Sequence, residues 1–398
     1  MTNTLYRFAI TILILVSTQQ AVLADALTIK PYAQWTFDTP IEQIIYRPTG
    51  TGFPIKLILT EAEITLYDST GNHIRAVSRA AADKFVINHN QSGFMLVQVN
   101  PSNLIDHEEI LYSFQVYDIQ GRPEYTLVQR VTNPDGILNY QFTSEKSILL
   151  TEKGRPYIIE LYNENTLLEV PSCQSGSSKS DEVFTLATKL KHANEMITAV
   201  SCSANIDSSS TEIRLWNHDQ GLGSPVFQSG RLIELNPLPK TDYYFMELEK
   251  GTGTSLSLFN RTQLIGTFPW QSWKIQKVNQ QFAFIISEKD FNIVNLGDGS
   301  IVSTYHPIDL SSISDAIFLP EWGIYLYLRY EPYFRENGRQ AFRNFQLEGV
   351  DKTGRIIHRS SFGTWTYSLP KIASIGKDLF GIHIHNAVLM YGIKLERD

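Results

Sequence analysis

The chain has 398 residues, of which 42% are hydrophobic and 19% are charged, and its formal net charge is −7. A chain this apolar folds, and its length suits one large domain or two ordinary ones. Nucleic-acid binding needs clustered Lys and Arg, so an acidic chain without a basic run is not expected to bind nucleic acid.

The first predicted element is an export signal. Arg7 ends a short polar region, Phe8 to Ser17 is apolar, and small residues lead to Ala24, where signal peptidase would cut. The apolar run is about ten residues long, whereas a spanning helix needs roughly 20. We expect cleavage after Ala24, with Ala26 as a second candidate, and a soluble mature chain without a membrane span. A mature chain of this kind would be periplasmic or secreted, and no Cys follows the apolar run to carry a lipid anchor.

The mature chain opens into units of four strand-like runs. The first unit reads EQIIYRP, FPIKLILTE, EITLYDS and HIRAVS, and the second reads KFVINHN, GFMLVQVN, LYSFQVYD and EYTLVQRV. Short apolar runs rich in aromatic and β-branched residues and broken by Gly, Pro, Asn or Asp favour strands. Later units repeat the scheme, so the chain is predicted to be all-β.

Within the units, an apolar run often stops at an aromatic residue followed by Asp or Asn. These stops are LYDSTG at Leu66, VYDIQG at Val116, LYNENT at Leu161, LWNHDQ at Leu215 and LFNRTQ at Leu258, with looser matches VNLGDG at Val294 and GVDKTG at Gly349. Their intervals of roughly 35 to 55 residues are typical of a repeat architecture with one small sheet per unit.

The chemistry of these stops predicts tight hairpins. An Asp at the first position of a turn can accept a hydrogen bond from the backbone two residues on, and a Gly three residues later tolerates a positive φ. Metal binding by Asp68, Asp118 and Asp351 is the alternative interpretation. One carboxylate per turn is too few for a calcium loop, so the hairpin interpretation is preferred and no metal site is predicted.

Four short antiparallel strands per unit, repeated along the chain, predict a β-propeller. The C-terminal unit has only three runs, from Lys371 to Lys394, while a lone strand-like run, Tyr32 to Asp38, precedes the first unit. If this N-terminal strand completes the C-terminal blade, the ring closes without open sheet edges. The count gives eight blades, with seven as the alternative, in one domain spanning residues 25–398.

The runs that end in YDSTG, YDIQG and VDKTG resemble the blades of quinoprotein-like and YVTN-type bacterial propellers, whose units often end a strand close to D-x-x-T-G. Only Thr70-Gly71 and Thr353-Gly354 keep the Thr-Gly pair. The Trp that commonly follows the pair in quinoprotein-like repeats is absent here. The resemblance implies a propeller fold, transfers no active-site residue, and gives no cofactor.

Four long connections fall in one topological class. In a blade of strands A to D, the A–B and C–D turns lie on one face of the ring, and the B–C and D–A connections lie on the other. The insertions begin at Asn100, Cys173, Ser203 and Arg329, and all are predicted to be B–C or D–A connections. The face that carries them is therefore the predicted binding face.

The last insertion, RYEPYFRENGRQAFRNF, concentrates arginine and aromatic residues in an otherwise acidic chain. Such residues are enriched at interface hot spots. The candidate partner-binding residues are Arg329, Tyr330, Tyr333, Phe334, Arg335, Arg339, Phe342 and Arg343. The alternative is a solvated hairpin whose arginines pair with Glu331 and Glu336.

Other residues offer less specific signals. Cys173 and Cys202 form a candidate disulfide, with two unpaired thiols as the alternative. His383 and His385 alternate along a predicted strand and should share a face, but no third ligand accompanies them and a structural role is preferred. The acidic and His residues 106–109 are assigned to a solvated loop, and Trp270, Trp273 and Trp365 are predicted to pack in the core.

Two functional hypotheses follow. The first is an exported, non-catalytic propeller that binds another protein or a ligand through the face with the long connections. The second is a periplasmic propeller enzyme or enzyme subunit, such as a lactonase-like hydrolase or a dehydrogenase subunit, with its chemistry in the central channel. The first is preferred because no cluster of catalytic residues can be identified in the predicted innermost strands.

Overall fold

The computed structural model of the chain describes most of residues 26–396. The described ranges are 26–47, 52–80, 83–87, 93–101, 110–131, 139–144, 147–152, 155–160, 166–169, 182–189, 195–203, 210–217, 221–238, 240–251, 253–287, 289–362 and 365–396. Within these ranges no helix is long and apolar enough to cross a membrane.

The described strands form eight separate antiparallel sheets, one for each blade. Blades 1 and 2 contain β2 (Ile41–Tyr46), β3 (Ile55–Thr60), β4 (Glu63–Tyr67) and β5 (His73–Ser78), then β6 (Lys84–Ile87), β7 (Gly93–Pro101), β8 (Ile110–Asp118) and β9 (Pro123–Val131). Blades 3 and 4 contain β10 (Asn139–Ser144), β11 (Ser147–Glu152), β12 (Arg155–Glu160) and β13 (Thr166–Glu169), then β14 (Glu182–Lys189), β15 (Glu195–Ser203), β16 (Ser210–Asn217), β17 (Gly221–Leu222) and β18 (Val226–Ser229).

Blades 5 to 8 follow the same order along the chain. Blades 5 and 6 contain β19 (Arg231–Pro237), β20 (Tyr243–Lys250), β21 (Gly253–Asn260) and β22 (Gln263–Phe268), then β23 (Ser272–Lys277), β24 (Phe282–Ser287), β25 (Phe291–Asn295) and β26 (Ile301–Tyr305). After the short 3-10 helix η2 (Leu310–Ser312), blades 7 and 8 contain β27 (Ile313–Leu319), β28 (Ile324–Phe334), β29 (Gln340–Asp351) and β30 (Ile356–Ser361), then β31 (Lys371–Ser374), β32 (Leu379–Ile384) and β33 (Ala387–Glu396).

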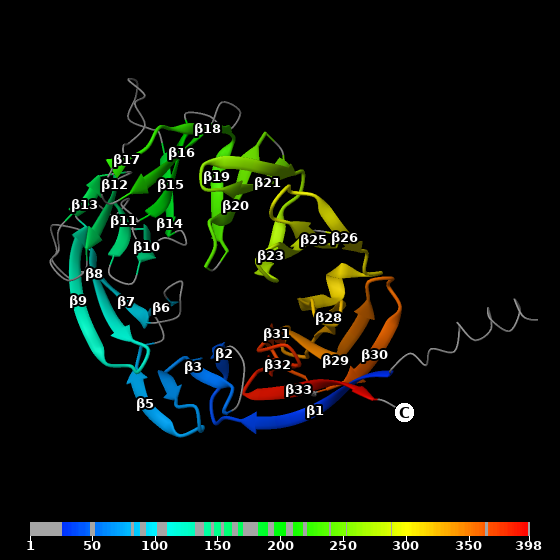
Figure 1. Cartoon of the computed structure of the whole chain (residues 1–398). Helices are drawn as coiled ribbons and strands as arrows, with labels where there is room; N and C mark the ends of the chain where they lie inside the picture. Colours follow the sequence, from blue (N-terminus) through cyan, green and yellow to red (C-terminus); the bar gives the residue numbers. More distant parts are fainter. Residues whose placement is uncertain are drawn as a thin grey trace, which may run out of the picture.

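The first strand of the chain closes the ring, as predicted. β1 (Ala26–Thr36) pairs antiparallel with β33, from Ala26 opposite Glu396 to Thr36 opposite Ala387, and supplies the fourth strand of blade 8. Figure 1 shows this pairing as the blue strand beside the red one. The prediction of eight four-stranded blades, closed by the N-terminal strand, is confirmed, with β18 as an added fifth strand in blade 4.

The hydrophobic core is divided into layers between neighbouring blades. One layer joins Leu57 and Leu66 of blade 1 to Phe94 and Leu96 of blade 2, and similar clusters join blades 6 and 7 and blades 7 and 8. The middle strands contact a neighbouring blade on both faces, so their burial is nearly continuous, as in FAFIIS of β24. This packing explains why the apolar runs of the sequence do not alternate with polar residues.

The Asp-x-x-Gly stops form the predicted hairpins between the third and fourth strands of their blades. Asp68 Oδ1 accepts hydrogen bonds from the backbone N–H groups of Thr70 at 2.8 Å and Asn72 at 2.9 Å. Gly71 follows with φ +92°. Asp118 and Asp351 make the equivalent bonds, so the hairpin interpretation of the motif is confirmed.

Candidate functional site

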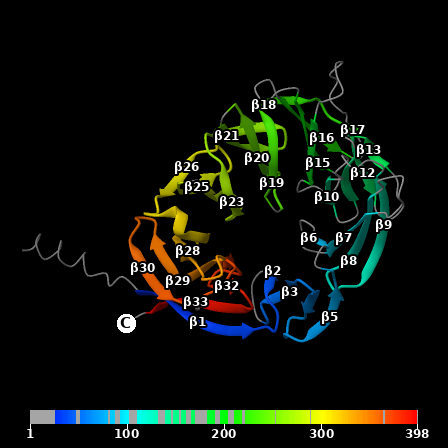
Figure 2. The same cartoon turned by 180° about the vertical axis from the view of Figure 1, so that it is seen from behind.

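The strand order assigns all four long connections to one face of the ring. They join β7 to β8, β13 to β14, β15 to β16 and β28 to β29, which are three B–C connections and one D–A connection. Most of the first three, including residues 102–109, 170–181 and 204–209, lies outside the described residues. The candidate site is therefore built from the fourth connection and its neighbours, at blades 7 and 8 in Figures 1 and 2.

The fourth connection is an extension of two strands beyond their blade. β28 and β29 stay paired out to Phe334 opposite Gln340, with a bulge between Arg329 and Glu331, and residues 329–345 are called the arm below. At the tip, the N–H of Arg335 donates to the carbonyl of Arg339 at 3.0 Å, and Gly338 takes a positive φ of 74°. The arm is thus a hairpin, which is the backbone structure that the solvated-hairpin alternative supposed.

A second segment holds the arm in place. Phe342 and Thr366 exchange two backbone hydrogen bonds of 2.8 and 3.0 Å, which joins the arm to the D–A connection between β30 and β31. The guanidinium of Arg335 lies 4.2 Å from the ring centroid of Trp365, and its Nη1 donates to Tyr367 Oη at 3.0 Å. The base of the arm is also fixed, because Tyr330 Oη donates to the carbonyl of Ser311 at 3.0 Å.

These contacts leave large aromatic side chains in solvent. Phe334 is 73% exposed, Trp365 is 45% exposed and Tyr367 is 43% exposed. The prediction that Trp365 packs in the core is wrong, because its ring covers Arg335 on the surface. Trp270 is partly buried against Phe268, and the side chain of Trp273 lies outside the described residues.

The structure separates the eight candidate partner-binding residues into two groups. Phe334, Arg335, Arg339 and Arg343 are exposed, whereas Arg329, Tyr330, Tyr333 and Phe342 are partly buried. Arg343 pairs with Glu331 at 2.7 Å. The solvated-hairpin alternative supposed such pairs for Glu331 and Glu336, and this ion pair agrees with it for Glu331. Whether the exposed group binds a partner remains a prediction.

Arg329 has a different environment from the rest of the arm. Its Nη1 lies 3.7 Å from Oε2 of Glu348, a residue that is 1% exposed, and its Nη2 donates to Ser312 Oγ at 3.1 Å. Glu348 also accepts from Tyr327 Oη at 2.6 Å and from Arg359 Nε at 2.8 Å. Arg329 thus anchors the base of the arm by balancing a buried carboxylate.

Trp365 and Tyr367 are part of the site, although no sequence pattern predicted that they contact the arm. They are far from the arm along the chain, and their approach depends on the pairing of Phe342 with Thr366. The hydrogen bond from Arg335 lowers the pKa of the Tyr367 hydroxyl, and the charges of Arg335 and Arg339 act in the same direction. The tip of the arm therefore carries a positive field.

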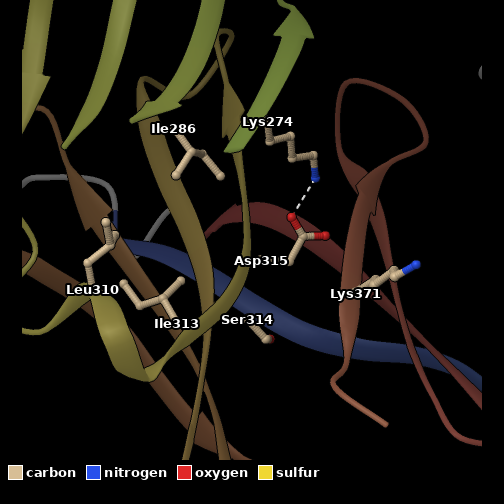
Figure 3. A pocket seen from close by; sticks show the side chains of 7 residues that line it. All are labelled: Lys274, Ile286, Leu310, Ile313, Ser314, Asp315 and Lys371. Carbon is tan, nitrogen blue, oxygen red and sulfur yellow. Dashed lines mark hydrogen bonds and ion pairs between the residues drawn. The ribbon is translucent and has the colours of Figure 1, made fainter. Parts of the chain in front are cut away.

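A cavity of about 310 Å³ lies at the first strands of blades 6, 7 and 8 (Figure 3). Its lining residues are Lys274, Ile286, Leu310, Ile313, Ser314, Asp315 and Lys371. Lys274 Nζ is 2.6 Å from Asp315 Oδ1, and Asp315 Oδ2 accepts from the N–H of Ile372 at 2.9 Å. This pair links β23, β27 and β31, while the side chain of Lys371 points away from it. Lys274 and Asp315 are thus engaged in joining three blades.

The histidine prediction is partly wrong. β32 ends at Ile384, so His385 lies in the turn before β33 with a positive φ of 54°, exposed, and does not share a strand face with His383. His383 stays in β32, where burial lowers its pKa to about 4, with a smaller contribution from the charge of Lys371. Within the described residues, no three His, Cys, Asp or Glu side chains are grouped so as to hold a metal ion.

The candidate disulfide stays a prediction. Cys202 belongs to β15, opposite Val183 of β14. Cys173 lies in the connection before β14, outside the described residues.

Comparison with known proteins defines the class of the protein by its fold. The sequence matches no protein-family model and no curated protein. The Dos1 propeller is similar at 8% identity with a TM-score of 0.51, over 92% of this chain and 95% of that chain. The WD40 domain of SCAP from fission yeast gives 10% identity and a TM-score of 0.49, over 93% of this chain and 98% of that chain. The chain is a β-propeller by its fold, and likeness at such identity shows the fold alone.

Proposed function

We propose that the protein is an exported, non-catalytic scaffold that binds a protein partner through the face carrying the arm. The observation behind this proposal is the exposed cluster of Arg335, Trp365 and Tyr367 at the arm. Aromatic and arginine side chains dominate the binding energy of protein interfaces, since they bury a large area and still form hydrogen bonds. An Arg–Trp pair with a half-exposed Tyr bonded to the same Arg has the composition of such a hot spot.

The fixed geometry of the cluster also supports binding. Ordering flexible side chains at an interface costs roughly 0.5–1.5 kcal/mol for each one immobilised. Arg335 is already held by Trp365 and Tyr367, and the arm backbone is held by Phe342 and Thr366. A partner would therefore meet a surface whose main anchor is ordered before binding.

Chemistry in the central channel has less support from the described residues. Lys274 and Asp315 line the cavity, but each is bonded to the other and to backbone atoms of neighbouring strands. Lys274 and Asp315 therefore form an ion pair that joins neighbouring blades, and this arrangement is not that of a free acid and base. The binding function is therefore preferred over the enzymatic one.

Export is proposed from the N-terminal sequence and agrees with the start of the fold. β1 begins at Ala26, which lies opposite Glu396 in β33. Cleavage after Ala24 would leave the whole of β1 in the mature chain, whereas cleavage after Ala26 would remove its first residue. Ala24 is therefore the preferred site.

The test of the binding function is a variant without the tip of the arm. Replacing Phe334–Gln340 by Asn-Gly would join Tyr333 to Ala341, which are register partners, through a two-residue turn. This armless variant keeps the bridge from Phe342 to Thr366. Phe334→Ser serves as a milder variant, and the double variant K352E/K377E changes only exposed residues in C–D and A–B turns on the opposite face.

The experiment captures partners from the envelope fraction, identifies them by mass spectrometry, and measures binding again with the purified partner. We expect the wild type and K352E/K377E to bind equally, Phe334→Ser to bind less tightly, and the armless variant not to bind. Equal affinity of the wild type and the armless variant, both with unchanged thermal unfolding, would contradict the proposal.

A further inference from the structure

The tip of the arm carries two arginines that no acidic side chain of the described residues neutralises. Arg343 is paired with Glu331, and Arg329 with Glu348. Arg335 and Arg339 are exposed at the two ends of the turn and form no ion pair within the described part of the chain. In a protein with a net charge of −7, this leaves a local positive site.

Arg335 is preorganised to bind a carboxylate. Stacking on Trp365 fixes the plane of its guanidinium, and its bond to Tyr367 uses only Nη1. Arginine has five N–H donors in a planar fork that matches the two oxygens of a carboxylate. Arg339, whose backbone carbonyl accepts a hydrogen bond from the N–H of Arg335, is also exposed.

The surroundings argue against a polyanionic ligand. Membrane and nucleic-acid surfaces are bound by larger clusters of cations, roughly four to eight for an anionic membrane. The arm offers two arginines without an ion pair in the described part of the chain, and it also carries Glu336, which would repel an extended anionic surface.

Addition of a strand to the arm is also disfavoured. β27 pairs with β28 only as far as Arg329, so the edge of β28 beyond that residue has no strand beside it in the described part of the chain. The backbone N–H and C=O of Phe342 point away from β28, because they bond to Thr366. Pro332 is opposite Phe342 in the ladder, so its backbone N and C=O also point away from the partner strand, toward the open edge. Pro332 has no N–H to donate on this open edge, and proline there is a common protection against strand addition. Recognition must therefore use side chains.

We propose that the arm binds an acidic peptide segment of the partner, with a carboxylate between Arg335 and Arg339 and a neighbouring large apolar side chain against Trp365 and Tyr367. This inference rests on the proposed binding function and adds the chemistry of the partner. It is supported by charge complementarity, since the site is positive while the rest of the chain is acidic.

The test uses a random 12-residue peptide library displayed on phage, selected on the wild-type mature protein against the armless variant. Selected peptides are then synthesised, and their affinities are measured for the wild type, for R335D/R339D and for K352E/K377E, which changes the net charge equally on the other face. Anionic vesicles and heparin serve as alternative ligands. A mild R335K variant tests whether the planar fork matters, because lysine keeps the charge but not the geometry.

The expected result is enrichment of peptides that combine Asp or Glu with an aromatic or large aliphatic residue. Their affinity should fall at least about tenfold in R335D/R339D and should stay unchanged in K352E/K377E. Peptides that depend on the arm but show no acidic preference, or bind R335D/R339D equally well, would overturn this inference and leave the binding function standing. Arm-dependent binding of vesicles or heparin without acidic peptides would also overturn it. If no peptide distinguishes the wild type from the armless variant, both proposals fail.

Discussion

Replacing the buried acid Glu247 by Gln should stabilise the protein at alkaline pH. Glu247 lies in β20 opposite Glu234 of β19 and is 1% exposed, and its Oε1 has no hydrogen-bond partner among the described residues. Burial raises its pKa from 4.5 to about 7, and the charge of Glu234 adds to the shift. The charged form of Glu247 is therefore disfavoured in the folded state.

The sign and size of the effect follow from this shift. Because the folded pKa is raised, the associated stability is fully present below pH 4.5 and is lost as the pH rises to about 7. At about 1.4 kcal/mol for each pH unit, the upper limit is about 3 kcal/mol, and screening by solvent near the exposed Glu234 reduces it to about 1–2 kcal/mol. Glu247→Gln cannot ionise, so it avoids this loss.

The assay is thermal unfolding of the wild type and Glu247→Gln between pH 5 and pH 8. We expect nearly equal melting temperatures at pH 5 and a gain of roughly 2 °C for the variant at pH 8. Glu234→Gln should give a smaller gain in the same direction, since it removes only the second cause of the shift. A gain that is the same at both pH values, or a loss at pH 8, would refute the reasoning.

Three further predictions concern stability and processing. Asp315→Ala should lower the free energy of unfolding by about 2–3 kcal/mol, because it leaves Lys274 without its carboxylate partner. Chemical denaturation measures this loss. A change below about 0.5 kcal/mol would contradict a stabilising role for the Lys274–Asp315 ion pair. Gly121→Ala should cost more than Gly338→Ala in the same measurement. Both glycines have a positive φ, 73° and 74°, but an added Cβ meets neighbouring side chains from 3.0 Å at Gly121 and no atom within 4 Å at Gly338. Finally, mass spectrometry of the exported protein should give Asp25 as its first residue, and an N-terminus at Met1 would show that the signal is not cleaved.

The fold could be predicted from the sequence because its determinants are local. The hydrogen bonds of Asp68, Asp118 and Asp351 reach only two to four residues along the chain, so their spacing is visible as a motif. The runs of the middle strands are apolar on both faces because each blade has two neighbours. Ring closure could also be predicted without knowledge of contacts. The sequence has three strand-like runs in its C-terminal unit and one before its first unit, and together they make one four-stranded blade.

The candidate site could be predicted only in part, because its contacts are not local. Composition drew attention to the arm, yet the residue that orients Arg335 is Trp365, which comes from another connection. The sequence also did not predict the direction in which individual side chains point. A bulge follows Arg329, and the side chain of Arg329 contacts the buried Glu348. β32 ends at Ile384, so His385 lies outside the strand. Bulges and strand ends depend on packing that a periodic pattern does not encode.

The difference between the two faces in the length of their connections has a physical origin. The C–D hairpins that begin at Asp68, Asp118 and Asp351 use Asp at the first position and Gly at the fourth, so folding itself constrains their length and composition. The B–C and D–A connections lie outside the blade sheets and can lengthen without disturbing a core layer. A long B–C hairpin alone would be a marginal two-stranded ribbon. In this protein the neighbouring D–A connection supports it through Thr366 and covers Arg335 with Trp365, so two adjacent connections together produce one ordered, positively charged surface.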